Sequence, residues 1–186
     1  MRKIVVFASG SGSNFENIVK KLHGRVCEVA LLVCDKPGAL CVERAEKLGI
    51  PSVTISPKDF NSKSGYEEEI IKKLSGEGID LIVLAGYMRI IGPVLLDAFE
   101  GKIINIHPSL LPAFKGLDAI GQAFRHGVRI MGATVHFVDS GMDTGTIIDQ
   151  MAFRLMDGDT RETVEEKIHA LEYALYPEVI EKLIKN

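Results

Sequence analysis

The sequence has few cysteines, no long apolar run and little net charge. Its three cysteines, Cys27, Cys34 and Cys41, are odd in number and form no C-x-x-C pair, so we expect neither a disulfide framework nor a metal site. No apolar run approaches the ~20 residues of a membrane span. The net charge of -3 does not favour nucleic-acid binding by the chain as a whole. These absences together indicate a cytoplasmic protein with reduced thiols and without metal, membrane or nucleic-acid partners.

What the 186 residues do contain is the composition of a globular protein, with 46% hydrophobic and 25% charged residues. This length suffices for one domain with a sizeable core. The apolar run Ile4–Ala8 follows a basic N-terminus in the manner of a signal peptide, but it is too short and meets a Gly/Ser-rich segment at once. We therefore interpret it as the buried first strand of a single domain spanning residues 1–186.

Apolar runs alternate with amphipathic segments through the first hundred residues. Residues 15–22 carry apolar side chains at helical spacing, and a capping box from Ser13 to Glu16 predicts that this helix begins near Ser13. Strands are expected at 4–8, 26–33, 52–55, 81–85 and 102–106, and further helices at 39–48, 66–74 and 93–99. This alternation predicts an α/β fold with a mostly parallel, twisted sheet flanked by helices, in a Rossmann-like arrangement.

The pattern changes after residue 110. A helix and a hairpin-like extension of two strands are expected there, at 119–126, 132–138 and 146–155. The segment Asp159–Glu162 then caps a long C-terminal helix. We accordingly divide the single domain into a βαβ part, residues 1–100, which is expected to bind phosphate, and a part from 101 to 186 that carries the candidate chemistry.

The turn Gly10–Asn14 joins the first strand to the first helix. Its glycines let the backbone approach a ligand closely, and the helix N-terminus offers free N–H groups, so the turn favours phosphate over a tight turn without ligand. Gly10 and Gly12 also form half of a dinucleotide fingerprint, with Asp35 placed to hold a ribose hydroxyl. Because Phe15 stands where that fingerprint needs a third glycine, a dinucleotide-binding domain stays open as the weaker alternative.

The segment Asn105–Pro112 follows an apolar run and continues into a proline-stiffened loop. Asn105 and His107 are two residues apart, which puts both side chains on one face of a strand. An amide donor beside an imidazole can stabilise an oxyanion and protonate a departing nitrogen. A hydrogen-bonded structural histidine is the alternative interpretation of this spacing.

A second polar segment, 139–145, presents Asp143 between two glycines. The functional interpretation places Asp143 near His107, where a carboxylate favours the protonated imidazole. An ordinary turn with a solvated aspartate is the alternative. His136 alternates with Thr134 along a predicted strand, so we expect it on the polar face, behind the residues that meet a substrate.

The motif Asn-x-His-Pro-Ser-x-Leu-Pro at 105–112 resembles the signature of the folate-dependent formyltransferases. The resemblance extends over nearly the whole chain, with the motifs in the expected order. It implies that the chain transfers a formyl group from 10-formyltetrahydrofolate, a co-substrate, to the amine of glycinamide ribonucleotide in purine biosynthesis, without a metal. The implied mechanism is direct amine attack, with a catalytic trio of Asn105 as oxyanion donor, His107 as general acid, and Asp143.

The resemblance also implies the binding residues. Gly12, Ser13 and Asn14 would hold the substrate phosphate, and Glu172 would meet the ribose or glycinamide part of the ribonucleotide. The implied folate-binding residues are Lys63, Met88, Arg89, Ile90, Ile91, Asn105, Asp139, Ser140, Gly141, Met142 and Asp143.

Two residues depart from the family pattern. Lys115 stands where a proline is common, and Asp118 stands where a histidine is common. Both follow the predicted catalytic loop, so we expect loop detail and substrate contacts to differ more than the type of reaction. Other folate-dependent formyltransferases and a folate deformylase are the alternatives within the family. Of these, the tRNA-charging formyltransferase carries an extra C-terminal domain and the deformylase an extra N-terminal domain, so the resemblance favours them less. A homodimer stays open, because the sequence does not determine the oligomeric state.

Overall fold

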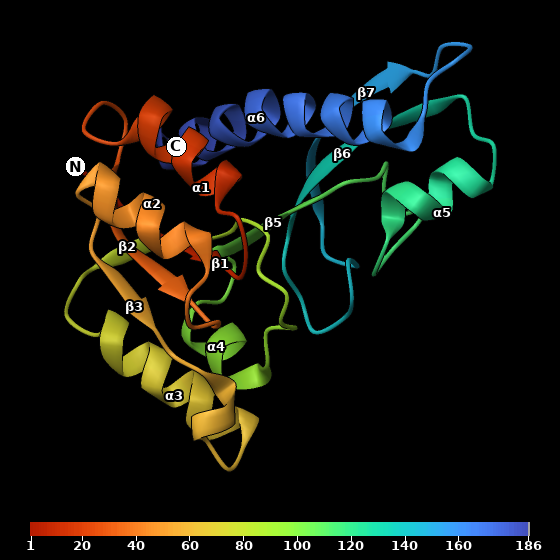
Figure 1. The fold of residues 1–186 in the computed structure, drawn as a ribbon. Coiled ribbons are helices and arrows are strands. Elements are labelled where there is room, and N and C mark those ends of the chain that lie inside the picture. The colour runs from red at the N-terminus through yellow and green to blue at the C-terminus, as the bar shows by residue number, and fades with distance from the viewer. Residues whose placement is uncertain (186) are drawn as a thin grey trace.

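The computed structural model describes residues 1–185, which form a single sheet with helices on both faces (Figure 1). The strands are β1 (Lys3–Ala8), β2 (Glu28–Cys34), β3 (Ser52–Thr54), β4 (Ile79–Leu84), β5 (Ile103–His107), β6 (Ile130–Phe137) and β7 (Ile147–Arg154). The helices are α1 (Ser13–Leu22), α2 (Leu40–Leu48), the short 3-10 helix η1 (Pro57–Asp59), α3 (Lys63–Leu74), α4 (Pro93–Ala98), α5 (Ala119–Arg125) and α6 (Arg161–Lys185).

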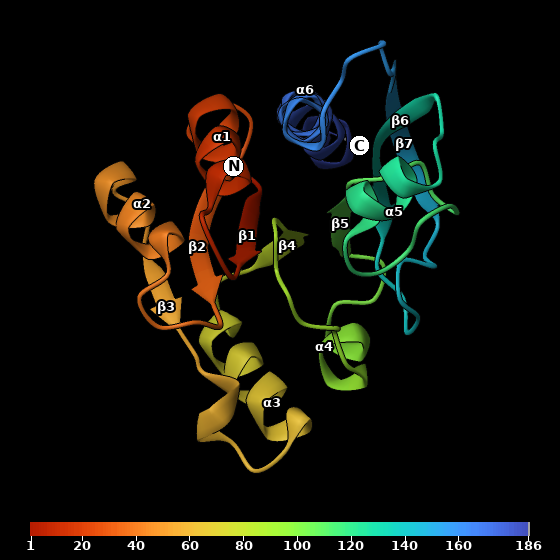
Figure 2. The same cartoon turned by 45° about the vertical axis from the view of Figure 1, so that its right-hand side comes forward.

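The seven strands lie in the order β3-β2-β1-β4-β5-β6-β7. Strands β1 to β5 pair in parallel, whereas β6 pairs antiparallel with both β5 and β7. Figure 2 shows α1 and α6 on one side of the sheet and α3 and α4 on the other. The predicted fold class, including the hairpin-like extension and the long C-terminal helix, is therefore confirmed.

Strand β1 shows why the first apolar run has no polar alternation. Ile4, Val6 and Ala8 enter the core beneath α1, α2 and α6, whereas Val5 and Phe7 enter the core on the side of α3 and α4. All five residues are fully buried. A parallel strand covered on both faces must be apolar at every position, and this central strand is the axis on which both layers pack.

Several element boundaries differ from the prediction by one to three residues, and strands β4 and β6 each begin two residues earlier than predicted. The second strand covers Glu28–Cys34 rather than 26–33. Helix α3 begins at Lys63 rather than at Tyr66, because Ser62 Oγ accepts a hydrogen bond from the amide of Gly65 at 3.1 Å and caps the first turn.

The capping box predicted for α1 is wrong, although the helix does begin at Ser13. The N-cap residue is Gly12, which has a φ of 72° and makes no side-chain cap. A Cβ at this position would lie 2.5 Å from Cβ of Cys41 in α2. Only glycine combines the left-handed backbone with this close approach, so the turn after β1 is determined by packing against α2 and not by a capping side chain.

Helix α6 continues through Pro177, which has no N–H to donate to the carbonyl of Tyr173 one turn earlier. Asn17 Nδ2 and Lys21 Nζ donate to that carbonyl instead, at 2.9 and 2.7 Å. Both donors belong to α1, which lies beside α6 in Figures 1 and 2. The proline thus frees an acceptor that joins the first and last helices.

Within residues 1–185, no helix has both the length and the apolar character that a membrane crossing requires.

The fully buried Tyr176 anchors α6 to the middle of the sheet. Its hydroxyl oxygen lies 2.9 Å from the carbonyl oxygen of Leu84 in β4 and 3.2 Å from that of Ile104 in β5. We expect Tyr176→Phe to lower the free energy of unfolding by about 1–3 kcal/mol, because buried carbonyls lose their donor. Urea denaturation measures the change, and Tyr173→Phe is the control on the same helix. Equal stabilities of the Tyr176→Phe protein and the wild type would contradict this anchoring role.

Candidate active site

A cleft of about 520 Å³ lies at the carboxyl ends of β1, β4 and β5. The strand order reverses between β1 and β4, and open α/β sheets bind ligands at such a point. The cleft is also walled by the β6–β7 connection and by α6. Among the predicted site residues, those lining it are Gly12, Ser13, Asn14, Met88, Arg89, Ile90, Ile91, Asn105, His107, Asp139, Gly141, Met142, Asp143 and Glu172.

His107 is the last residue of β5 and is 5% exposed. Its Nδ1 lies 3.4 Å from Oδ2 of Asp143, and its Nε2 lies 2.9 Å from the carbonyl oxygen of Phe114. Because a carbonyl only accepts hydrogen bonds, Nε2 carries a hydrogen. Nδ1 faces the carboxylate of Asp143, so each ring nitrogen of His107 lies beside an oxygen that can accept a hydrogen bond.

Asn105 lies directly opposite His136 in the β5–β6 pairing. Asn105 Nδ2 is 3.2 Å from Nε2 of His136, and His136 Nδ1 donates to the carbonyl of Phe137 at 2.8 Å. In the neutral ring, Nε2 of His136 therefore accepts one amide hydrogen of Asn105. The second amide hydrogen of Asn105 is left to face the cleft, which is the arrangement an oxyanion donor needs.

His136 is closer to the candidate chemistry than the sequence pattern suggested. It is 2% exposed, lines the cleft, and its Nε2 lies 3.6 Å from Oδ1 of Asp143. Polar alternation along β6 predicted only the face of the sheet. The cross-strand register between β5 and β6 is the additional signal that would have paired His136 with Asn105.

Asp143 lies between the two imidazoles. Partial burial raises its pKa, but the imidazole of His136, the amide of Gly116 and the neighbouring His107 lower it, and together they hold the pKa of Asp143 below its ordinary value. The Gly116 amide donates to Oδ2 of Asp143 at 2.8 Å. The carboxylate is thus ionised at neutral pH and is shared by a loop amide and two histidines.

Left-handed backbone is concentrated around this carboxylate. Within residues 1–185, the non-glycine residues with positive φ are Phe114, Asp118 and Asp143, with φ of 55°, 53° and 54°. Phe114 supplies the carbonyl that contacts His107, and the other two residues line the cleft. Such conformations are costly and collect where a site needs a particular geometry.

The turn after β1 faces α6 across one end of the cleft. Asn14 Nδ2 donates to Oε2 of Glu172 at 2.9 Å, and the same oxygen lies 3.1 Å from Nδ1 of His169. The hydrogen bond with Glu172 raises the pKa of His169, against the opposing effect of burial. This end of the cleft therefore combines the N-terminus of α1 with a charged pair on α6.

Asp35, which the dinucleotide alternative assigns to a ribose, forms a hydrogen bond with an arginine side chain instead. Its Oδ2 accepts a hydrogen bond from Arg89 Nε at 2.8 Å, and this bond raises the pKa of Arg89. Phe15, at the position where the fingerprint needs a third glycine, is fully buried in the core. Both observations weigh against a dinucleotide site.

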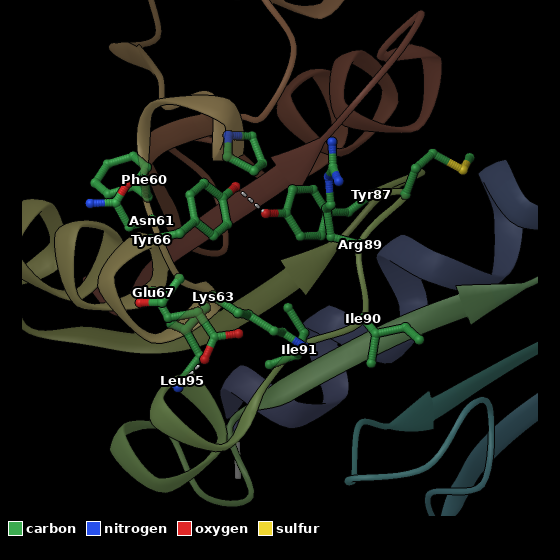
Figure 3. Close-up of a pocket in the computed structure, with 13 residues that line it drawn as sticks. Phe60, Asn61, Lys63, Tyr66, Glu67, Tyr87, Arg89, Ile90, Ile91 and Leu95 are labelled. Atoms are coloured by element: carbon green, nitrogen blue, oxygen red, sulfur yellow. Dashed lines mark hydrogen bonds between the residues drawn. The ribbon is translucent and has the colours of Figure 1, made fainter.

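A second cavity, of about 560 Å³, adjoins the cleft along the segment 87–91. Figure 3 shows Lys63 and Tyr66 of α3 on one side of it, with Arg89 on the other. The hydroxyls of Tyr66 and Tyr87 lie 2.5 Å apart between these walls. Lys63 therefore lies in a side cavity rather than in the cleft itself, and Ser140 lines neither space.

The two departures from the family pattern lie in a loop that forms hydrogen bonds with residues of α5 and α6. Asp118 pairs with Arg125 at 3.0 Å and with Arg161 at 2.8 Å. The hydrogen bond from Arg125 is the main reason that the pKa of Asp118 lies below its ordinary value. The carbonyl of Lys115 accepts from Gln122 Nε2 at 3.1 Å. These contacts fasten the loop to α5 and α6.

A metal ion has no evident place among these groups. Within residues 1–185, no group of three or more histidine, cysteine, aspartate or glutamate side chains is arranged to hold one. The lining of the cleft includes an amide donor, imidazoles and carboxylates.

Comparisons with known proteins find relatives that match nearly the whole chain. The chain is 56% identical to the phosphoribosylglycinamide formyltransferase of Bacillus subtilis, over 99% of this chain and 95% of that protein. It is 38% identical to the trifunctional purine biosynthetic protein adenosine-3 of Drosophila melanogaster, of which it covers only 14%. The crystal structure of glycinamide ribonucleotide transformylase 1 from Geobacillus kaustophilus superposes with a TM-score of 0.95, at 55% identity and with 99% of each chain covered.

The match to a family is equally extensive. Residues 2–180 match the family described as formyl transferase, which confirms the resemblance found in the sequence. On this match and on the identity to its relatives, the chain belongs to the formyl transferase family.

Proposed function

We propose that this chain transfers the formyl group of 10-formyltetrahydrofolate to the amine of glycinamide ribonucleotide in purine biosynthesis. The observation that carries the proposal is the meeting of two features in one cleft. Asn105, His107 and Asp143 form a group suited to acyl transfer, and the turn at 10–14 opens into the same space. The names of the relatives supply the substrates, since the B. subtilis protein is a phosphoribosylglycinamide formyltransferase.

The two substrates would bind at opposite ends of the cleft. The amides of Gly12, Ser13 and Asn14 and the dipole of α1 would hold the ribonucleotide phosphate, with Glu172 toward the ribose or glycinamide part. The folate ring would lie along Met88, Arg89, Ile90 and Ile91 and against Asp139, Ser140, Gly141, Met142 and Asp143. The acidic end of the folate would extend into the side cavity, where Lys63 and Arg89 supply positive charge.

The reaction itself needs no covalent intermediate with the protein. The amine lone pair attacks the formyl carbon, and the carbonyl electrons move onto oxygen. Asn105 donates its free amide hydrogen to that oxyanion, and one such donor is typically worth about 10²–10³ in rate. The imidazolium of His107 places a positive charge beside the developing negative charge on oxygen.

Collapse of the tetrahedral intermediate then moves protons in both directions. The bond from the formyl carbon to N10 breaks, and N10 takes a proton from His107. The attacking nitrogen loses its proton to Asp143, directly or through a water, and return of that proton to His107 restores the starting pair. Since both nitrogens of His107 have protein partners, one of these contacts must open for the proton to leave.

A folate deformylase is the second candidate within the family. It would use the same trio with water as the nucleophile and would have no use for a phosphate site. The glycine-containing turn at 10–14, which lines the cleft at the N-terminus of α1, favours a second, phosphorylated substrate.

The deciding assay is folate product formation from 10-formyltetrahydrofolate, with and without glycinamide ribonucleotide. We expect product only when the ribonucleotide is present. Product formed equally without it would identify a deformylase. No product under either condition, together with no folate binding, would overturn the proposal.

Removing either member of the charged pair should affect the chemical step. We expect His107→Ala and Asp143→Ala to lower kcat by about 10²–10⁴, the usual range for general acid–base catalysis, with much smaller changes in KM. Steady-state kinetics on both substrates measures this. His23→Ala, at the exposed end of α1 and away from the cleft, is the control and should leave kcat unchanged. Near-normal kcat in both cleft variants would remove them from the mechanism.

The lowered pKa of Asp143 also predicts a pH-dependent contribution to stability. A carboxyl whose pKa is lower in the folded state contributes stability above its unfolded pKa of about 3.9, and loses it as pH falls through the folded value. We therefore expect wild type to exceed Asp143→Asn in free energy of unfolding near neutral pH, with the difference shrinking as pH falls from about 4 through the lower pKa of the folded state. Urea denaturation at several pH values measures it, and a difference that grows in acid would show the reverse shift.

A further inference from the structure

The loop that follows β5, residues 108–116, has no regular secondary structure but determines the surroundings of His107. Its residue Phe114 has a left-handed backbone and presents its carbonyl to Nε2 of His107 at 2.9 Å. The orientation of the imidazole therefore depends on backbone atoms of an irregular loop. Such a loop needs contacts outside itself to hold one conformation.

Thr134 of β6 supplies the first of these contacts. It lies opposite His107 in the β5–β6 pairing and is fully buried. Its hydroxyl donates to the carbonyl of Ser109 at 2.6 Å and accepts from the amide of Leu111 at 3.0 Å. A hydroxyl has one hydrogen and two lone pairs, so one acceptor site is left after these two bonds.

Gln150 of β7 fills that last site. It lies opposite Thr134 in the β6–β7 pairing, and its Nε2 donates both to Oγ1 of Thr134, at 2.9 Å, and to the carbonyl of Leu111, at 3.0 Å. Both amide hydrogens and the whole capacity of the hydroxyl are therefore used. His107, Thr134 and Gln150 thus form one row across three adjacent strands, and Thr134 and Gln150 hold the loop.

The row reaches His107 through the loop backbone. Ser109, whose carbonyl Thr134 holds, donates from its own Oγ to the carbonyl of Ala113 at 2.6 Å. Ala113 precedes Phe114, whose carbonyl contacts His107. Every link in this path is a hydrogen bond or a peptide bond, so displacing one end displaces the acceptor at Nε2.

We propose that Thr134 and Gln150 are positioning residues for the general acid. They fix the loop so that the Phe114 carbonyl holds His107 with its Nδ1 toward Asp143. Neither residue lines the cleft, so they act through the loop and not on substrate. The kinetic part of this proposal rests on the proposed formyl transfer, whereas the ordering of the loop does not.

Gln150→Leu is the sharpest test, because the residue is exposed and the change removes only the amide. We expect kcat to fall by about tenfold to a hundredfold, the cost of a small misplacement in a catalytic group. KM for both substrates should stay within about twofold, because the binding surfaces are untouched. Thr134→Val should produce the same loss and Thr134→Ser, which keeps the hydroxyl, should restore kcat.

Hydrogen exchange of the loop is the readout independent of activity. Peptides covering 108–116 should exchange faster in Gln150→Leu than in wild type, whereas peptides from β1 should not change. Arg154→Leu, at another exposed position on β7, is the matched control and should alter neither exchange nor kcat.

The outcomes separate the two proposals. An active wild type with unchanged kcat and unchanged loop exchange in Gln150→Leu overturns the positioning role. A loss confined to KM also overturns it. An inactive wild type overturns the proposed function, and loop exchange in the same variants still decides whether Thr134 and Gln150 hold the loop.

Discussion

The antiparallel pairing of β5 with β6 is the constraint on which the candidate site depends. It sets Asn105 opposite His136 and His107 opposite Thr134, so one register determines the partners of both candidate catalytic side chains of β5. Since side chains alternate across a strand, a slip of one residue would turn the side chains of one strand to the opposite face and break both pairings. The parallel strands before β5 supply the position of the cleft, and the hairpin extension supplies its polar partners. This explains why an antiparallel unit follows an otherwise parallel sheet at the edge where the chemistry lies.

His107 lies in a regular strand, whereas the groups that contact its imidazole come from loops with an energetically costly backbone. The imidazole itself ends a strand, but its two partners, Asp143 and the carbonyl of Phe114, come from loops with left-handed backbone. Each such conformation costs on the order of 1–3 kcal/mol. The contacts that offset this cost are visible, as the Gly116 amide binds Asp143 and the Thr134 hydroxyl binds the loop before Phe114. The left-handed backbone thus lies in the two residues that supply the acceptors, whereas His107 keeps an ordinary strand geometry.

Local patterns in the sequence predicted the fold and most of the residues that line the cleft, but not the contacts between segments that are distant in the chain. The apolar run of β1 and the helical spacing of Phe15 to Leu22 predicted buried elements, because each pattern follows from packing within that element. The capping box at Ser13 failed because Gly12 packs on Cys41, a contact between residues far apart in the chain. The position of His136 beside Asn105, and of Lys63 in a side cavity, depended on strand register and helix placement. Tertiary contacts of this kind leave no local period in a sequence, which is why periodicity does not find them.

The pairing of Glu172 with His169 removes an apparent conflict at the other end of the cleft. A buried carboxylate beside a turn that is suited to phosphate would repel the anion if it stood alone. Glu172 is 5% exposed, but it accepts hydrogen bonds from Asn14 and from His169, whose pKa it raises. The imidazole of His169, whose pKa is raised, lies beside the carboxylate, and the N-terminus of α1 adds a partial positive charge. Asn14 connects the two helices, since it lies in the first turn of α1 and donates a hydrogen bond to the carboxylate of Glu172 in α6. The end of the cleft is thus electrostatically prepared for an anion even though its most buried charged residue is acidic.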